Sequence, residues 1–96
     1  MAIKTIIELQ AKPGERDQLV KAMDNVLASM KEAKGFIGIN RYEVIDNPDS
    51  LIEIAEWESP EARQTWLEQS MVTGSLSNLM GTLGVPFKAI TVRKIE

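Results

Sequence analysis

The stretch LIEIAEWESPEARQTWL, residues 51–67, decides the fold of this chain and carries both of its tryptophans. Up to Trp57 the stretch alternates with the period of a strand, in which successive side chains point to opposite faces of a sheet. We therefore predict a strand with two distinct faces. One face carries Leu51, Glu53, Ala55 and Trp57, and the other carries Ile52, Ile54, Glu56 and Glu58.

After Trp57 the pattern changes and predicts the start of a helix. Ser59 is a favoured N-cap residue, Pro60 suits the first helical position, and Glu61 places negative charge where the helix dipole favours it. The apolar side of this helix is made of Ala62, Trp66 and Leu67. The strand and the helix bring the two indoles to the same end of the core, and this junction is the candidate site.

Three further segments alternate as strands. Residues 3–11 predict the first strand, residues 36–45 the second and residues 87–95 the last. In the second strand, alternation places on one face Phe36, Gly38, Asn40, Tyr42 and Val44. Residues 46–50 form a dense turn cluster, so we expect the second and third strands to form an antiparallel hairpin whose loop is longer than a tight two-residue turn.

Two segments have the apolar spacing of helices. Between residues 19 and 30 apolar side chains form one stripe, and Gly35 is well placed for the left-handed residue that ends this helix. The helix that begins at Ser59 loses its pattern around residues 69–74, and helical spacing resumes over residues 72–83. Glycines weaken this part by about 1 kcal/mol each. We therefore expect the second helix to be broken in two.

The predicted order of elements is strand, helix, strand, strand, broken helix, strand. This is the split βαβ, ferredoxin-like arrangement of the α+β class, with an antiparallel sheet and helices on one face. From this length we expect the 96 residues to form one domain. The other face is not cleanly polar, because it carries Ile6, Ile54 and Ile90. An antiparallel sheet that is apolar on both faces should be buried on both, so we expect a homodimer in which a second protomer's sheet supplies the cover.

Composition argues against several classes of partner. The formal net charge of −3, with basic residues scattered singly, argues against binding to nucleic acid or to an anionic membrane. No apolar run approaches the ~20 residues of a membrane span, and the charged N-terminal stretch is unlike a signal peptide. A cytoplasmic location is therefore the default expectation.

The chain contains no histidine and no cysteine. Imidazole-based triads, histidine-ligated metals, thiolate nucleophiles and sulfur-ligated metal sites are therefore excluded, and we expect no metal site. Any catalysis must use carboxylates, Tyr42, lysine, arginine, amides or the chemistry of the substrate itself.

The residues of the junction also have structural interpretations. Trp57 and Trp66 serve equally well as large core residues or as part of a binding site. Glu53 alternates with apolar residues and would be costly to bury alone. It therefore either pairs with a basic residue at a sheet edge or dimer rim, or lines a wet pocket.

The second strand and the methionines offer further contacts. Asn40 and Tyr42 share a face and present an amide and a phenol to a ligand, while Tyr42 also suits a dimer interface. Arg41, on the opposite face, suits an ion pair with a carboxylate of the third strand such as Glu56. Met71 and the other methionines offer an adaptable apolar lining for a core or for a flat hydrophobic ligand.

Three parts of the sequence carry a likeness to a known family. They are the Pro13-Gly14 turn, the Gly35-Phe36 junction and, most specifically, residues 56–62 with the sequence EWESPEA. Through them the chain resembles the antibiotic biosynthesis monooxygenase domain family, small dimeric α+β barrels with this order of elements. The resemblance implies cofactor-independent oxygenation of a polycyclic phenol or quinol-type substrate, in a pocket between the sheet and the helices of each protomer.

The resemblance also implies roles by position. The oxygenase branch pairs an asparagine with a tryptophan four residues later, and this chain has Glu53 and Trp57 at these positions. A glutamate whose pKa is raised by burial can act as a general base, but it cannot donate the hydrogen bond that an amide gives to an oxyanion. The haem-degrading branch shares Trp66, but its asparagine and its haem-ligating histidine are missing near Ile7 and Leu76, so haem degradation is not expected.

Two hypotheses about function follow. The first is a cofactor-independent monooxygenase acting on a small aromatic or quinol-type metabolite, with Glu53 and Trp57 as catalytic residues. Its substrate-binding residues are Trp66, Asn40, Tyr42 and Met71. The second is a non-catalytic dimeric barrel that binds a small hydrophobic molecule, and quenching of tryptophan fluorescence without turnover distinguishes it from the first.

Overall fold

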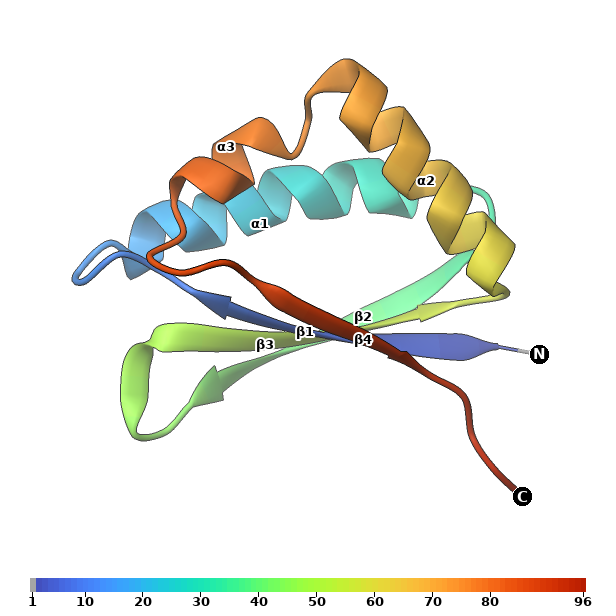
Figure 1. The fold of residues 1–96 in the computed structure, drawn as a ribbon, viewed down its shortest axis with the longest axis horizontal. Coiled ribbons are helices and arrows are strands. Elements are labelled where there is room, and N and C mark those ends of the chain that lie inside the picture. The colour runs from blue at the N-terminus through green and yellow to red at the C-terminus, as the bar shows by residue number, and fades with distance from the viewer. Residues whose placement is uncertain (1) are drawn as a thin grey trace.

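The computed structural model describes residues 2–96, which form a sheet covered on one face by helices (Figure 1). The elements are β1 (Ile3–Gln10), α1 (Arg16–Lys31), β2 (Phe36–Val44), β3 (Asn47–Trp57), α2 (Pro60–Thr73), α3 (Ser77–Gly81) and β4 (Lys88–Val92). The predicted α+β, ferredoxin-like fold is confirmed. The last strand is shorter than the predicted 87–95.

The sheet is antiparallel, with the strand order β2-β3-β1-β4. The two central strands run side by side, so that Ile3 lies opposite Trp57 and Leu9 lies opposite Leu51. The helix-facing side chains of β3 are buried, as the alternation predicts. Because these positions receive cover from the helices, the candidate site lies inside the molecule.

The hairpin between β2 and β3 differs from the prediction of a long turn over residues 46–50. The turn is confined to Ile45 and Asp46, and β3 begins at Asn47. Val44 pairs with Asn47 while Glu43 pairs with Leu51, so the residues between them form an irregularity in the ladder. Pro48, which has no N–H to donate to a ladder, is accommodated there. Most of the turn-forming residues of the predicted cluster therefore lie in the irregular first part of β3 and not in the turn itself.

A second irregularity, near the start of β2, overturns the predicted faces of that strand. Phe36 pairs with Trp57, but Gly38 pairs with Glu56, so Ile37 is an extra residue. Such a bulge reverses the alternation of the residues that follow it. Phe36 and Ile39 consequently both pack against the core.

The helix α1 presents the predicted apolar stripe to the sheet. Its buried residues are Leu19, Ala22, Met23, Val26 and Met30. The helix ends at Lys31 with Glu32 as C-cap, so Gly35 does not end it as predicted. Gly35 has a φ of +89° and leads into β2, and a Cβ on it would lie 2.6 Å from the Cβ of Ala62. This glycine therefore permits α2 to approach the turn closely.

The start and the break of the second helix are both confirmed. The Ser59 Oγ accepts a hydrogen bond from the backbone N–H of Ala62 at 3.1 Å, and Pro60 occupies the first helical position. The helix α2 ends at Gly74, which has a φ of +72°, and α3 follows as a separate short helix. The left-handed glycine is the reason for the break.

The face of the sheet away from the helices carries an apolar row. Ile54, Ile6 and Ile90 are neighbours across β3, β1 and β4, and Ile90 is 60% exposed. Tyr42, on the same face, is 49% exposed. Within residues 2–96, no helix combines the length and the apolar character needed to cross a membrane.

Candidate functional site

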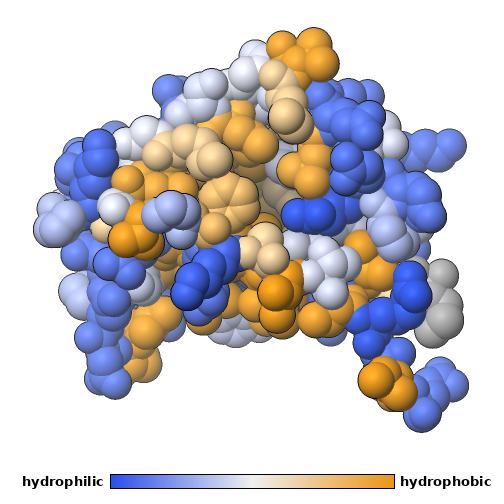
Figure 2. All heavy atoms as spheres, in the orientation of Figure 1, coloured by the Kyte–Doolittle hydropathy of each residue, from blue (hydrophilic) through white to orange (hydrophobic). Residues whose placement is uncertain are grey.

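A cavity of about 170 Å³ lies between the sheet and the helices. Its wall comes from β1, β3, β4 and all three helices, and it is apolar except for Thr5, Glu53 and Arg63. Figure 2 shows hydrophobic side chains gathered around a hollow between the helices and β4. An apolar cavity of about 150 Å³ is large enough to bind benzene, so this space suits an aromatic ring.

The two tryptophans form one wall of the cavity. Trp57 is 1% exposed and Trp66 8% exposed, and their ring centroids lie 5.8 Å apart. The indole N–H of Trp66 donates a hydrogen bond to Ser29 Oγ at 3.1 Å, and Phe36 packs edge-on against Trp57 at 5.4 Å. These contacts hold both indoles in place. The prediction that strand and helix bring them together is confirmed.

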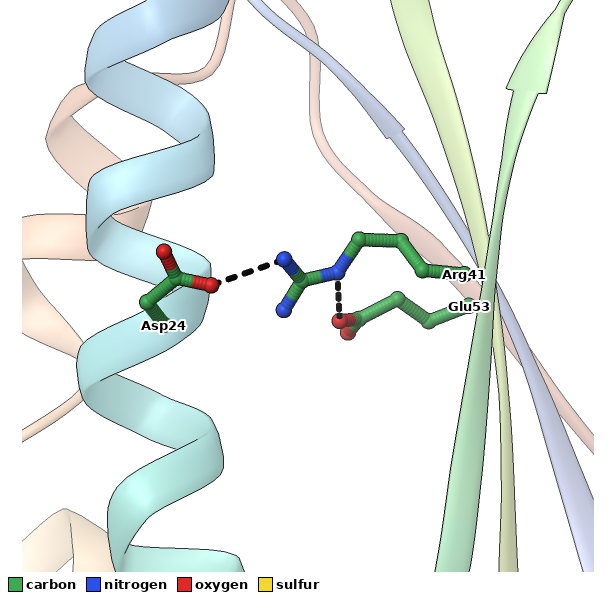
Figure 3. Close-up of polar contacts among 3 residues, drawn as sticks. All are labelled: Asp24, Arg41 and Glu53. Carbon is green, nitrogen blue, oxygen red and sulfur yellow. Dashed lines mark hydrogen bonds and ion pairs between the residues drawn. The ribbon is translucent and has the colours of Figure 1, made fainter.

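Glu53 lines the same cavity and is 7% exposed. Arg41, directly opposite it on β2, donates a hydrogen bond from Nε to the Oε2 of Glu53 at 3.0 Å. The guanidinium then reaches Asp24 of α1, where Nη1 donates to Oδ1 at 2.8 Å (Figure 3). The two carboxylates therefore hold Arg41 from the sheet and from the helix, and Arg41 in turn holds Glu53.

Burial raises the pKa of the Glu53 carboxyl above its usual range, and the charge and hydrogen bond of Arg41 oppose this shift without cancelling it. Burial tends to lower the pKa of Arg41, but its contacts with Asp24 and Glu53 outweigh that effect and raise it. A carboxylate with a raised pKa is a stronger base near neutral pH. Within residues 2–96, Arg41 bonds Oε2 of Glu53 and no hydrogen bond reaches Oε1.

Three predicted substrate-binding residues lie away from this cavity. The bulge in β2 turns Asn40 and Tyr42 to the opposite face of the sheet, where they border a separate hollow. Met71 is 76% exposed on α2. The structure therefore brings together Glu53, Trp57 and Trp66, but not these three.

The predicted ion pair between Arg41 and a carboxylate of the third strand is present, but the partner is Glu53 and not Glu56. The register places Arg41 opposite Glu53, and both side chains point to the helix face of the sheet. Glu56 pairs with Gly38 and belongs to the opposite face. The basic partner considered for Glu53 is thus present, and it comes from the neighbouring strand.

Two polar residues of the cavity had no place in the predicted site. Thr5 lies on the helix-facing side of β1, and the alternation of that strand already indicates this orientation. Arg63 stands three residues before Trp66 and four before Leu67, the spacing of one helix face. The periodicity of the sequence indicates the orientation of both side chains. An isolated threonine or arginine does not by itself indicate a binding site, however.

The sequence of residues 2–73 matches the family described as antibiotic biosynthesis monooxygenase. The chain belongs to this family. A search of curated proteins finds no match. The family resemblance inferred from residues 56–62 is therefore confirmed, and the match includes every residue of the Glu53–Trp57–Trp66 cluster.

Solved structures of several proteins share the fold of this family member. A conserved protein from Methanosarcina mazei Go1 has a TM-score of 0.87 and 18% identity, over 99% of this chain and 94% of its own. A variant of SnoaB, a cofactor-independent oxygenase from Streptomyces nogalater, has a TM-score of 0.86 and 13% identity over the same shares. Rv0793 from Mycobacterium tuberculosis has a TM-score of 0.85 and 14% identity, over 100% of this chain and 97% of its own. These likenesses establish the fold.

The donor atoms around the cavity do not form a metal site. Among residues 2–96, no group of three or more aspartate or glutamate side chains converges in a way that would hold a metal ion. What the cavity offers is one buried carboxylate, one hydroxyl, one guanidinium and a large aromatic surface.

Proposed function

We propose that this protein is a cofactor-independent monooxygenase that acts on a small aromatic or quinol-type metabolite. The observation that carries this proposal is that the buried carboxylate of Glu53 lines the same apolar cavity as the indoles of Trp57 and Trp66. Membership of the antibiotic biosynthesis monooxygenase family supports the class of reaction. The size and apolar character of the cavity support a flat aromatic substrate.

In the proposed reaction, Glu53 removes a proton from an acidic CH₂ group of the substrate, and the aromatic system delocalises the resulting carbanion. The carbanion transfers one electron to O₂, and the radical pair combines to form a C–O bond. The proton held by Glu53 returns to the peroxide, and the hydroperoxide loses water to become a ketone. One oxygen atom thus enters the product, the other leaves as water, and the substrate supplies all the electrons.

Each residue of the cluster has a role in this scheme. The free Oε1 of Glu53 is the base, and its raised pKa suits proton abstraction near neutral pH. Arg41 is a positioning residue, because it contacts Glu53 and does not line the cavity. Trp57 and Trp66 hold the flat substrate, and their exclusion of water keeps the carbanion from being reprotonated by solvent.

Oxygen uptake by the pure protein tests the proposal. The panel consists of two-ring naphthoquinol-type compounds, whose keto tautomers carry the acidic CH₂ group, and of three-ring anthrone-type compounds as a comparison of size. We expect uptake above the buffer rate for at least one two-ring compound. Glu53→Gln should lower that rate by about 100-fold or more, because general base catalysis contributes about 10²–10⁴. Glu56→Gln, a change on the opposite face of the same strand, should leave the rate unchanged. Buffer-level rates across the panel would contradict the proposal.

The ion pair of Glu53 favours a second candidate function. A carboxylate already bonded to Arg41 at 3.0 Å has a structural role that needs no chemistry, and the remaining cavity then serves only to bind a small hydrophobic molecule. Quenching of the fluorescence of Trp57 and Trp66 by ligands that are recovered unchanged would favour this function.

The proposal also includes a homodimer formed through the face of the sheet away from the helices. The row of Ile6, Ile54 and Ile90 supports this arrangement, since it leaves apolar surface exposed on a single chain. Sedimentation equilibrium should give a dimer for the unmodified chain. Ile90→Lys should shift it toward monomer, whereas Ile95→Lys, at a site already 91% exposed, should not.

A further inference from the structure

Two polar groups in the cavity wall have no partner within the described chain. The side chain of Thr5 is fully buried, and its Oγ1 makes no hydrogen bond. Arg63 lines the cavity, and no carboxylate of residues 2–96 lies within ion-pair distance of its guanidinium. Buried polar groups are normally satisfied, so the unbonded hydroxyl of Thr5 points to a partner that is not part of the protein. Arg63 is only partly buried, but it brings an unpaired positive charge to the same cavity.

Arg63 stands at an unfavourable place for a positive charge. It is the fourth residue of α2, at the end of the first turn, where the positive end of the helix dipole disfavours a cation. Burial against the apolar wall lowers its pKa, yet a guanidinium remains charged at neutral pH. An anion beside Arg63 would offset both penalties, because its attraction stabilises the charged guanidinium.

Glu53, the other charged group of the cavity, differs from Arg63 in having a partner within the protein. Glu53 already has Arg41 as its partner, so it needs no cation from a ligand. An ionised Glu53 repels an anionic substituent, which is therefore directed toward Arg63 and away from the proposed base. The indoles of Trp57 and Trp66 supply the flat apolar surface for the rest of the ligand.

We propose that Arg63 and Thr5 recognise an anionic oxygen substituent, such as a carboxylate, on a one- or two-ring aromatic ligand. The size follows from the volume of about 170 Å³, which is little more than the space that accepts benzene. Arg63 supplies the charge and Thr5 a hydroxyl donor. This inference rests on the proposed function, because it specifies the class of molecule that enters the same cavity.

Isothermal titration calorimetry with two ligands of matched shape tests the inference. The probes are 2-naphthoate, which carries a carboxylate, and 2-naphthamide, which is neutral. The unmodified protein should bind 2-naphthoate at least tenfold more tightly. Arg63→Gln should abolish this preference by weakening the binding of 2-naphthoate much more than that of 2-naphthamide, and Arg63→Lys should retain part of it. Arg93→Gln, outside the cavity, should behave as the unmodified protein does.

Thr5→Val provides an independent readout. It should weaken the binding of 2-naphthoate several-fold. It should also raise the melting temperature, because it replaces an unsatisfied buried hydroxyl by a methyl group of similar size. A folding defect would lower both the affinity for 2-naphthoate and the melting temperature. Weaker binding together with a higher melting temperature therefore shows that Thr5 acts in ligand recognition.

The outcomes distinguish this inference from the proposed function. Equal affinity for the two probes, or a preference that persists in Arg63→Gln, would overturn the role of Arg63 while leaving a cavity that binds aromatic molecules. Failure of both probes to bind at millimolar concentration would overturn the proposed function and this inference together.

Discussion

Replacing Arg41 with methionine should destabilise the protein strongly, because it leaves the carboxylate of Glu53 buried without a partner. The side chains of the pair are 27% and 10% exposed and their hydrogen bond is 3.0 Å long. Removing one partner of a buried ion pair costs about 3–5 kcal/mol. The partial exposure of Arg41 favours the lower end, about 3 kcal/mol, which corresponds to a fall in melting temperature of roughly 12–24 °C for a domain of this size.

The loss of stability in Arg41→Met should be larger at high pH than at low pH. Because the folded pKa of Glu53 is raised, the folded state disfavours the ionised carboxylate, and removing Arg41 raises the pKa further. Below the ordinary glutamate pKa of about 4.3, Glu53 is protonated in both the folded and unfolded states, and the penalty disappears. The penalty grows as the pH rises from this ordinary value toward the raised folded pKa of the variant, and it levels off above that pKa. The variant should therefore differ little from the unmodified protein near pH 4 and most near pH 8.

Thermal unfolding followed by circular dichroism, at fixed protein concentration, measures this effect. The double variant Arg41→Met with Glu53→Gln should recover most of the stability lost at pH 8, because no buried charge remains. Arg16→Met is the matched control, since its contact with Glu43 is 3.5 Å long and largely exposed and should contribute less than about 1 kcal/mol. An equal loss at both pH values, or a double variant no more stable than the single one, would refute the reasoning.

Two further predictions concern local structure and are measured by urea unfolding. Gly35→Ala should lower the free energy of unfolding by at least about 2 kcal/mol, because the residue has a φ of +89° and a Cβ there would meet Ala62. Gly14→Ala should lower it by only about 1 kcal/mol, because Gly14 has a φ of +75° but open space around it. A similar cost at both glycines would show that the contact is unimportant. Ser59→Ala should cost about 1 kcal/mol through loss of the cap of α2, and Ser75→Ala, at an exposed site, close to nothing.

Most of the elements were predictable because their signals are local. The helix start after Trp57 depends on a cap and a proline, and both act within one turn of the chain. The break before α3 depends on Gly74, whose left-handed conformation few other residues adopt. The family resemblance through residues 56–62 could also be recognised, because this contiguous motif coincides with the strand-to-helix junction.

The candidate site was predictable only in part. Trp57 and Trp66 were placed correctly, because each stands on a regular element whose period indicates its orientation. Asn40 and Tyr42 were placed on the wrong face relative to Phe36, because strict alternation takes no account of the bulge after Phe36. A bulge depends on how two strands pair, and this pairing is not visible in either strand alone.

The sequence by itself determined the order of strands and helices, the buried faces of β1, β3 and α1, and the meeting of the two indoles. Only the tertiary structure decided that Arg41 pairs with Glu53 rather than Glu56, and that Arg63 and Thr5 face the same cavity. The physical reason is that period and capping act over a few neighbouring residues, whereas ion pairs and cavities depend on the register between elements. That register results from packing the whole chain at once.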